Sequence, residues 1–178
     1  TPVSPPITAP TGETTVQIPL TAASSGWLGS DGTVNLGPAE LPRAGDMADG
    51  TAVRALLTFS LADLPSNALI RTAFLRFSSD AAVESDPFAA LGCLQGELAE
   101  VNLPPDNTAY DAPGFFISCE TSAPSSIAVA IDVEDALALG QTQLILRLGF
   151  ETESNGDAVA NLYSMRTVPT LEVSYLLP

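Results

Sequence analysis

TAVRALLTFSLADLP, residues Thr51 to Pro65, combines the clearest strand pattern of the chain with the clearest strand end. Side chains of a β-strand point alternately to its two faces, so this strand has one fully apolar face and one mixed face. The apolar face holds Val53, Ala55, Leu57 and Phe59, and the mixed face holds Ala52, Arg54, Leu56 and Thr58. Pro65 ends the pattern because it has no backbone N–H to donate to a sheet. The pattern is typical of a central strand in a sandwich sheet.

A second strand pattern, ALIRTAFLRF from Ala68 to Phe77, follows at once. Other short apolar runs are separated by turn-forming residues, and they cover residues 14–20, 91–101, 115–122, 126–133, 142–150, 159–163 and 170–176. The segment EDALALG, from Glu134 to Gly140, predicts one or two helical turns that end at the glycine. The chain is therefore predicted to be all-β, with a single jelly-roll-like β-sandwich of about nine or ten strands over residues 14–178.

Composition narrows the class of protein. A chain of 178 residues with 46% hydrophobic content suits one domain with a sizeable core. The net charge is −15, and all six positive side chains are arginines. Such a surface repels phosphate backbones and anionic lipids, so no nucleic-acid partner is expected. No apolar run reaches the roughly 18 residues of a membrane span, so no membrane insertion is expected either.

Histidine and lysine are both absent. The chain therefore lacks the commonest general base, the commonest nitrogen ligand for metals and the Schiff-base nucleophile. A carboxylate pair remains as a catalytic route, but 21 acidic residues make such a pair unspecific. We predict that the protein is not an enzyme, and no catalytic residues are assigned.

Cys93 and Cys119 are the two cysteines, and each lies in a strand-like segment. They are either two buried free thiols or a disulfide. We favour the disulfide in this acidic, turn-rich chain without lysine, and it implies an oxidising compartment. Because the chain begins at Thr1 without an initiator methionine or a signal segment, we expect an exported protein, extracellular or at the cell surface, whose signal peptide has been cleaved.

The first 13 residues, TPVSPPITAPTGE, differ from the rest of the chain. They contain four prolines and only Val3 and Ile7 as sizeable apolar side chains. This composition predicts an extended, polyproline-like N-terminal arm that cannot bury itself. The arm is expected to dock either along its own domain or on a neighbouring copy.

Two acidic turns have features of calcium-binding loops. The turn from Glu151 to Asp157 alternates oxygen-bearing side chains and contains Gly156, although Leu162 stands where the loop needs a bidentate carboxylate. The same turn also fits a hairpin at Asn155-Gly156. The second turn, GDMADG with Asp46 and Asp49, also fits ordinary turn chemistry, in which aspartates accept backbone hydrogen bonds. No cofactor is expected except possible calcium. Its candidate ligands are Asp46, Asp49, Glu151, Glu153, Asn155 and Asp157.

Aromatic residues are few, so sugar-stacking candidates are few. Trp27 is expected in the core. Tyr110, in a long loop with Asp106 and Asn107, is the better candidate for an exposed ligand platform, and the alternative is that it covers the core. The strand arginines, Arg54 and Arg147, are expected to pair with acids on a solvated face.

Several short motifs occur in a recognisable order over residues 14–177. They are Ser25-Gly26-Trp27, Gly45-Asp46, Arg54 to Phe59 with Leu64-Pro65, Ile70, Ala73 to Phe77, Asp132-Val133, Leu139-Gly140, Leu144 to Leu148 and Pro169 to Tyr175. This order resembles the DNRLRE-type extracellular jelly-roll domains, which are similar to certain carbohydrate-binding modules. The resemblance implies a secreted or cell-surface domain that is non-enzymatic by itself.

These observations support one main functional hypothesis and two alternatives. The main hypothesis is a structural subunit of a filament or surface assembly, a homopolymer in which the arm adds as a strand to the next copy through Val3 and Ile7. The first alternative is a secreted polysaccharide-binding or adhesion module that uses Tyr110, Asp106 and Asn107. The second is a calcium-stabilised surface-layer or matrix protein.

Overall fold

The structure is a computed structural model that describes residues 12–178. The expected anchors of the arm, Val3 and Ile7, lie outside the described residues. No helix within the described range is long and apolar enough to cross a membrane.

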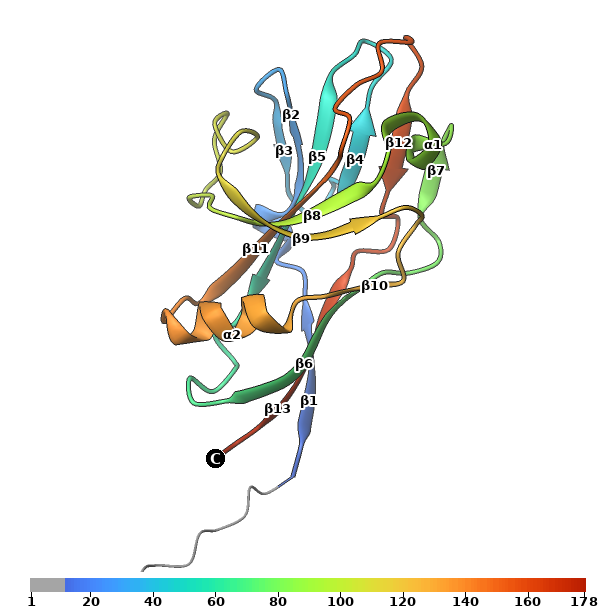
Figure 1. Cartoon of the computed structure of the whole chain (residues 1–178). Helices are drawn as coiled ribbons and strands as arrows, with labels where there is room; N and C mark the ends of the chain where they lie inside the picture. The colour runs from blue at the N-terminus through green and yellow to red at the C-terminus, as the bar shows by residue number, and fades with distance from the viewer. Residues whose placement is uncertain (1–11) are drawn as a thin grey trace, which may run out of the picture.

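The chain folds as a β-sandwich of two packed sheets, which confirms the predicted fold class (Figure 1). The four-stranded sheet has the order β1-β13-β6-β10. The nine-stranded sheet has the order β7-β12-β4-β5-β11-β8-β9, with β2 on β5 and β3 on β2. The first sheet comprises β1 (Thr14–Pro19), β6 (Leu69–Arg76), β10 (Ser126–Ala128) and β13 (Thr170–Leu176). The second comprises β2 (Gly26–Gly29), β3 (Val34–Leu36), β4 (Arg43–Asp46), β5 (Ala52–Ser60), β7 (Ala82–Glu84), β8 (Leu94–Ala99), β9 (Gly114–Glu120), β11 (Gln143–Phe150) and β12 (Asn161–Ser164).

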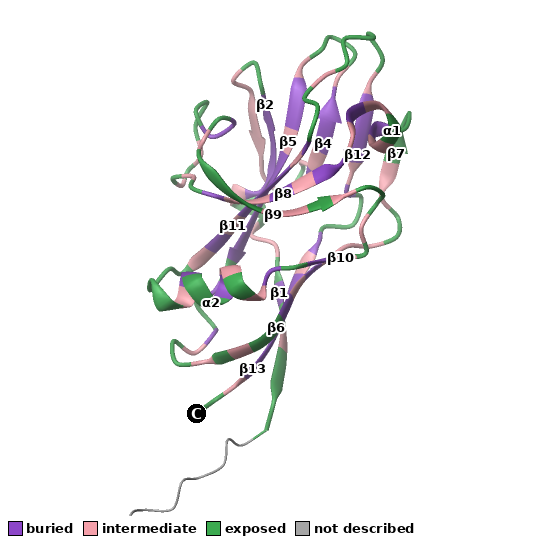
Figure 2. Cartoon of the chain, in the orientation of Figure 1, coloured by how far each residue is buried: buried purple, intermediate pink, exposed green. Residues whose placement is uncertain are grey.

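Strand β5 is the central strand that the sequence predicts, and Figure 2 shows it largely buried. Ala55, Leu57 and Phe59 are fully buried in the main core between the sheets. The mixed face is covered too, because Ala52 and Leu56 pack in a second cluster beneath the loop between β8 and β9. Both faces of β5 are therefore covered. This explains why the strand contains more apolar residues than a pattern that alternates apolar and polar residues would give.

The helix of the sandwich is longer than predicted. The sequence predicts a strand over residues 126–133, but only β10 is extended and α2 (Ala130–Ala138) follows it directly. Val129, Val133 and Ala136 are buried at helical spacing, whereas Ile131 is exposed. The local period-two pattern was therefore misleading. The end of the helix is as predicted, since Gly140 follows it with φ +69°.

Other differences concern short elements and connections. Residues 12–178 form thirteen strands, and β4 and β7 lie between the segments predicted to be strands. A short helix α1 (Pro87–Leu91) and a 3-10 turn (Ala22–Ser24) were also not predicted. The turn at Asn155-Gly156 does not form a hairpin, because β11 lies between β5 and β8 while β12 lies between β4 and β7. Turn residues indicate a reversal but not which strands pair across it.

The predicted disulfide is present between Cys93 and Cys119, whose Cα atoms are 5.4 Å apart. Cys93 directly precedes β8, and Cys119 lies in β9. The bond therefore fastens the outermost strand at this side of the nine-stranded sheet to its neighbour.

Candidate functional site

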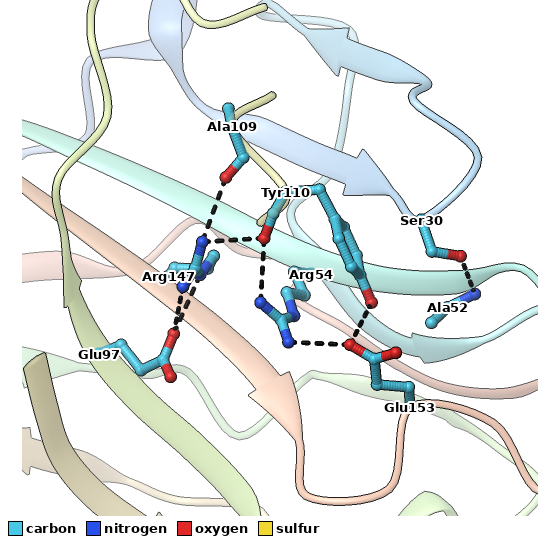
Figure 3. Close-up of polar contacts among 8 residues, drawn as sticks. All are labelled: Ser30, Ala52, Arg54, Glu97, Ala109, Tyr110, Arg147 and Glu153. Atoms are coloured by element: carbon cyan, nitrogen blue, oxygen red, sulfur yellow. Dashed lines mark hydrogen bonds and ion pairs between the residues drawn. The ribbon is translucent and has the colours of Figure 1, made fainter. Parts of the chain in front are cut away.

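Two arginines hold the long loop between β8 and β9 (Figure 3). Arg147 of β11 lies opposite Leu56 of β5 in the register, so it shares a face with Arg54. Nη1 of Arg54 donates to the carbonyl oxygen of Tyr110 at 2.9 Å, and Nη1 of Arg147 donates to the same oxygen at 2.9 Å. Arg147 also donates to the carbonyl oxygen of Ala109 at 3.1 Å. The backbone of the loop is thereby fixed over the mixed face of β5.

The side chains around this carbonyl complete a closed network, which we call the Tyr110 cluster (Arg54, Glu97, Tyr110, Arg147 and Glu153). Nε and Nη2 of Arg147 donate to Oε2 of Glu97 at 3.0 and 2.7 Å. Nη2 of Arg54 donates to Oε1 of Glu153 at 2.9 Å, and the hydroxyl of Tyr110 donates to the same oxygen at 3.2 Å. The predicted pairing of both arginines with acids is confirmed. The predicted solvated face is wrong for Arg147, which is only 3% exposed.

Tyr110 is not an exposed platform, so that prediction is wrong and the alternative, that it covers the core, holds. The residue is 4% exposed, and the Arg54 guanidinium lies 4.5 Å from the centre of its ring. Burial raises the pKa of the Tyr110 hydroxyl to about 12. A ring held in this way has no free face to stack on a ligand.

The other two residues of the predicted glycan site, Asp106 and Asn107, are exposed, so the buried ring of Tyr110 forms no common surface with them. The carboxylate of Asp106 accepts hydrogen bonds from Oγ1 and the backbone N–H of Thr108 at 2.6 and 2.9 Å, and these bonds lower its pKa. Asp106 therefore stabilises its own turn.

The candidate calcium ligands are engaged with protein donors. Asp46 is 1% exposed and accepts hydrogen bonds from the backbone N–H groups of Asn155 at 3.3 Å and Asn161 at 3.2 Å. It thus ties the loop after β11 to β4. Asp49, which is exposed, accepts from the backbone N–H of Thr51, and this bond lowers its pKa.

The remaining candidates do not gather around one point. Glu153 belongs to the Tyr110 cluster, and Glu151 lies against Gly92. Asn155 donates from Nδ2 to Oδ2 of Asp157 at 2.9 Å. Within residues 12–178, no group of three or more histidine, cysteine or acidic side chains is placed to hold a metal ion. Calcium binding stays a prediction.

Trp27 is in the core, as predicted, with 6% of its surface exposed. Its indole N–H donates to Oε2 of Glu40 at 3.2 Å, and the Arg43 guanidinium lies 4.1 Å from its ring centre. Glu40 therefore occupies the indole N–H of Trp27, and Arg43 covers one face of its ring.

A different feature lies at the β9 side of the same sheet. Strand β9 pairs with β8, and none of the described residues pairs with its other edge. Beside it is an open groove of about 760 Å³ between the end of β8, the start of β11 and the last turn of α2. Its walls are mixed. Leu98, Val101, Phe115, Ala136, Leu139 and Ile145 are apolar, whereas Glu100, Asn102, Asp135, Gln141, Thr142 and Gln143 are polar or charged. We call this surface the β9 groove.

The β9 groove carries apolar side chains that the domain leaves uncovered. Phe115 is 61% exposed and Leu139 is 74% exposed. The next residue along β9, Phe116, is 65% exposed on the opposite face of the strand. The sequence analysis missed this surface. The available signal was the Phe115-Phe116 pair, because adjacent strand residues point to opposite faces and only one of them can enter the core.

Comparison with known proteins matches the chain to no family model and to no curated protein.

Proposed function

We propose that the protein is a structural subunit of an extracellular filament or surface assembly, in which the N-terminal arm of one copy adds as a strand to the next copy. The observation that carries this proposal is that an N-terminal arm without charged side chains over residues 1–12 precedes a domain with an open strand edge beside exposed apolar side chains. The protein is proposed to have no enzymatic activity of its own.

The distribution of charge supports the arm as the contact between copies. The net charge of −15 makes two copies repel each other. Residues 1–12 contain no acidic or basic side chain, so this segment approaches another copy without adding to the repulsion. An assembly joined through the arm keeps the acidic domain surfaces apart and in water.

The prolines of the arm are compatible with strand addition in one register. Alternate residues of a strand direct their backbone N–H and C=O groups towards the same neighbour. The odd-numbered positions Val3, Pro5, Ile7 and Ala9 are all apolar, and only Pro5 lacks an N–H. In this register the arm keeps three of four donors and presents its two large apolar side chains on one face.

The extracellular setting is part of the proposal. It is supported by the Cys93–Cys119 disulfide, since such bonds persist in oxidising compartments. The resemblance to DNRLRE-type extracellular domains points the same way.

The test uses the full chain and two matched double variants, examined by negative-stain electron microscopy and light scattering. The wild-type protein is expected to form filaments. Val3→Asp with Ile7→Asp places charges on the docking face and should leave monomers, whereas Ser4→Asp with Thr8→Asp adds the same charge on the other face and should keep filaments. Wild-type monomers at every concentration, or filaments of the first variant, would overturn the proposal.

Two further measurements separate the two alternatives, which stay predictions. Monomers that are retained by a glycan in affinity electrophoresis indicate the polysaccharide-binding or adhesion module. A melting temperature that falls on addition of a chelator indicates the calcium-stabilised surface-layer or matrix protein.

A further inference from the structure

We propose that the β9 groove is the acceptor site, and that residues 3–9 of a second copy lie along the free edge of β9 with Val3 and Ile7 against Phe115 and Leu139. This inference rests on the proposed function and assigns the surface on which the arm docks. Its occupant is a named segment of a second copy of this chain.

The choice of β9 follows from the edges that the domain offers. The strands with an unpaired side among residues 12–178 are β1, β3, β7, β9 and β10. β3, β7 and β10 have three residues each, and β1 has six and ends in Pro19. β9 has seven residues. It is the longest open edge and contains no proline.

The length of β9 matches the apolar part of the arm. Residues 3–9 number seven, as do the residues of β9. Both segments span roughly 24 Å when extended, at about 3.4 Å per residue. Pairing over this length leaves residues 10–13 to connect to β1 of the donor copy.

The β9 groove offers two exposed apolar side chains, Phe115 and Leu139, to the two large apolar side chains of the arm. Phe115 lies opposite Leu98 in the register and Phe116 lies opposite Glu97, so Phe115 is on the face that carries the groove. Large apolar side chains on an edge strand are usually covered or replaced by charges, since open edges promote association. Here they remain exposed beside an open edge, and β1 carries no comparable exposed apolar side chain.

The placement of β1 favours docking on another copy. The described chain enters β1 at Thr14, which pairs with Tyr175 close to the C-terminus. β1 then runs towards the nine-stranded sheet, where Leu20 forms a bridge with Phe59. Figure 1 shows this entry point at the bottom of the four-stranded sheet, below α2 and β9. Donor and acceptor at different ends of the domain give a head-to-tail contact, which builds an open polymer.

Two single variants of the full chain test the assignment, because α2 offers a matched pair. Leu139 and Ile131 are both 74% exposed at the two ends of the helix, and of these two only Leu139 lines the groove. Leu139→Asp is expected to raise the concentration needed for assembly at least tenfold, while Ile131→Asp leaves it within twofold. Unchanged circular dichroism and melting temperature serve as the folding control.

A mixing experiment tests the assignment independently. The arm variant Val3→Asp with Ile7→Asp has an intact groove, and the Leu139→Asp variant has an intact arm. Each is expected to be monomeric alone, and the mixture should form one-to-one dimers and nothing larger by size-exclusion chromatography with light scattering. If Leu139→Asp assembles like Ile131→Asp, or if the monomeric variants do not dimerise on mixing, the groove assignment is overturned while the proposed function stands. If the wild-type chain never assembles, the proposed function itself fails.

Discussion

The Tyr110 cluster and the β9 groove both use residues of β8 and β11, but their side chains differ in how far they are buried and paired within the domain. In the cluster, the aromatic ring is buried and each charged group has a partner within the domain. In the groove, Phe115 and Leu139 are left largely exposed. The sequence pattern predicts a glycan site in the loop of the cluster only for the first alternative function, whereas the main hypothesis uses the arm. We infer that the Tyr110 cluster, whose charged groups are paired within the domain, stabilises the fold. The β9 groove, whose apolar side chains are exposed, is available for a partner.

The largest effect on stability is expected from Arg147→Ala. This change leaves the Glu97 carboxylate and the Ala109 carbonyl without their buried donor and the Tyr110 carbonyl with Arg54 alone, which should lower the free energy of unfolding by about 3 kcal/mol. Arg76→Ala is the matched control, because it breaks an ion pair with Glu172 whose arginine side chain is 42% exposed. The control should cost less than about 1 kcal/mol. Urea unfolding measures both, and equal losses would contradict a structural role for the cluster.

Loss of the Cys93–Cys119 disulfide should have an effect of similar size. The bond closes a loop with a sequence separation of 26 residues, and the chain-entropy model gives about 3 kcal/mol for such a loop. Because the bond holds β9 against β8, reduction should also weaken assembly. Melting curves with and without reductant measure the effect, and a Cys93→Ala with Cys119→Ala variant should not respond to reductant. Assembly that survives reduction of the folded protein would argue against β9 as the acceptor.

Alkaline pH should weaken the Tyr110 cluster. The pKa of Tyr110 is raised from 10.0 to about 12 by burial, so the folded protein holds this proton more tightly than the unfolded chain. The corresponding stability is complete below about pH 10 and is lost as the pH rises towards 12, by up to about 1.4 kcal/mol per pH unit. Tyr110→Phe should flatten this decline in unfolding experiments.

Tyr163, whose pKa burial also raises, should leave part of the alkaline decline in place in the Tyr110→Phe variant. An identical alkaline profile for the variant and the wild type would show that Tyr110 is not ionised in this range.

The smallest expected effect is that of salt on assembly. Raising the salt concentration from about 0.1 M to about 1 M shortens the screening length from about 10 Å to about 3 Å. Residues 3–9 of the arm carry no charged side chain, so screening should mainly reduce the repulsion between the acidic domains and promote assembly. Light scattering across this range measures the effect. Polymers that dissolve as salt is added would indicate ionic contacts instead.

The sequence predicts an element correctly where the local residue pattern matches the burial of those residues in the fold. Alternation along β5 predicted its faces, because both its strand period and its burial are properties of nine consecutive residues. The disulfide and the end of α2 at Gly140 were likewise predictable from composition and a single glycine. Alternation failed over residues 126–133, because four apolar residues fit both a strand and the start of a helix.

The two regions compared above depend on contacts that no local pattern encodes. Tyr110 is turned inward by arginines 56 and 37 residues away in the chain. The β9 groove forms where the end of β8, the start of β9 and the last turn of α2 meet. Sequence could indicate that Phe115 and Phe116 cannot both be buried, but not what lies beside them.

Hydrogen exchange of the assembled full-length protein, measured by mass spectrometry, tests the central claim most directly. If the arm of one copy pairs with β9 of the next, backbone amides within residues 114–120 should exchange much more slowly in the polymer than in the Val3→Asp with Ile7→Asp monomer. The same comparison should leave β1 unchanged. Equal exchange of β9 in both samples, with new protection along β1 or another edge, would contradict the account.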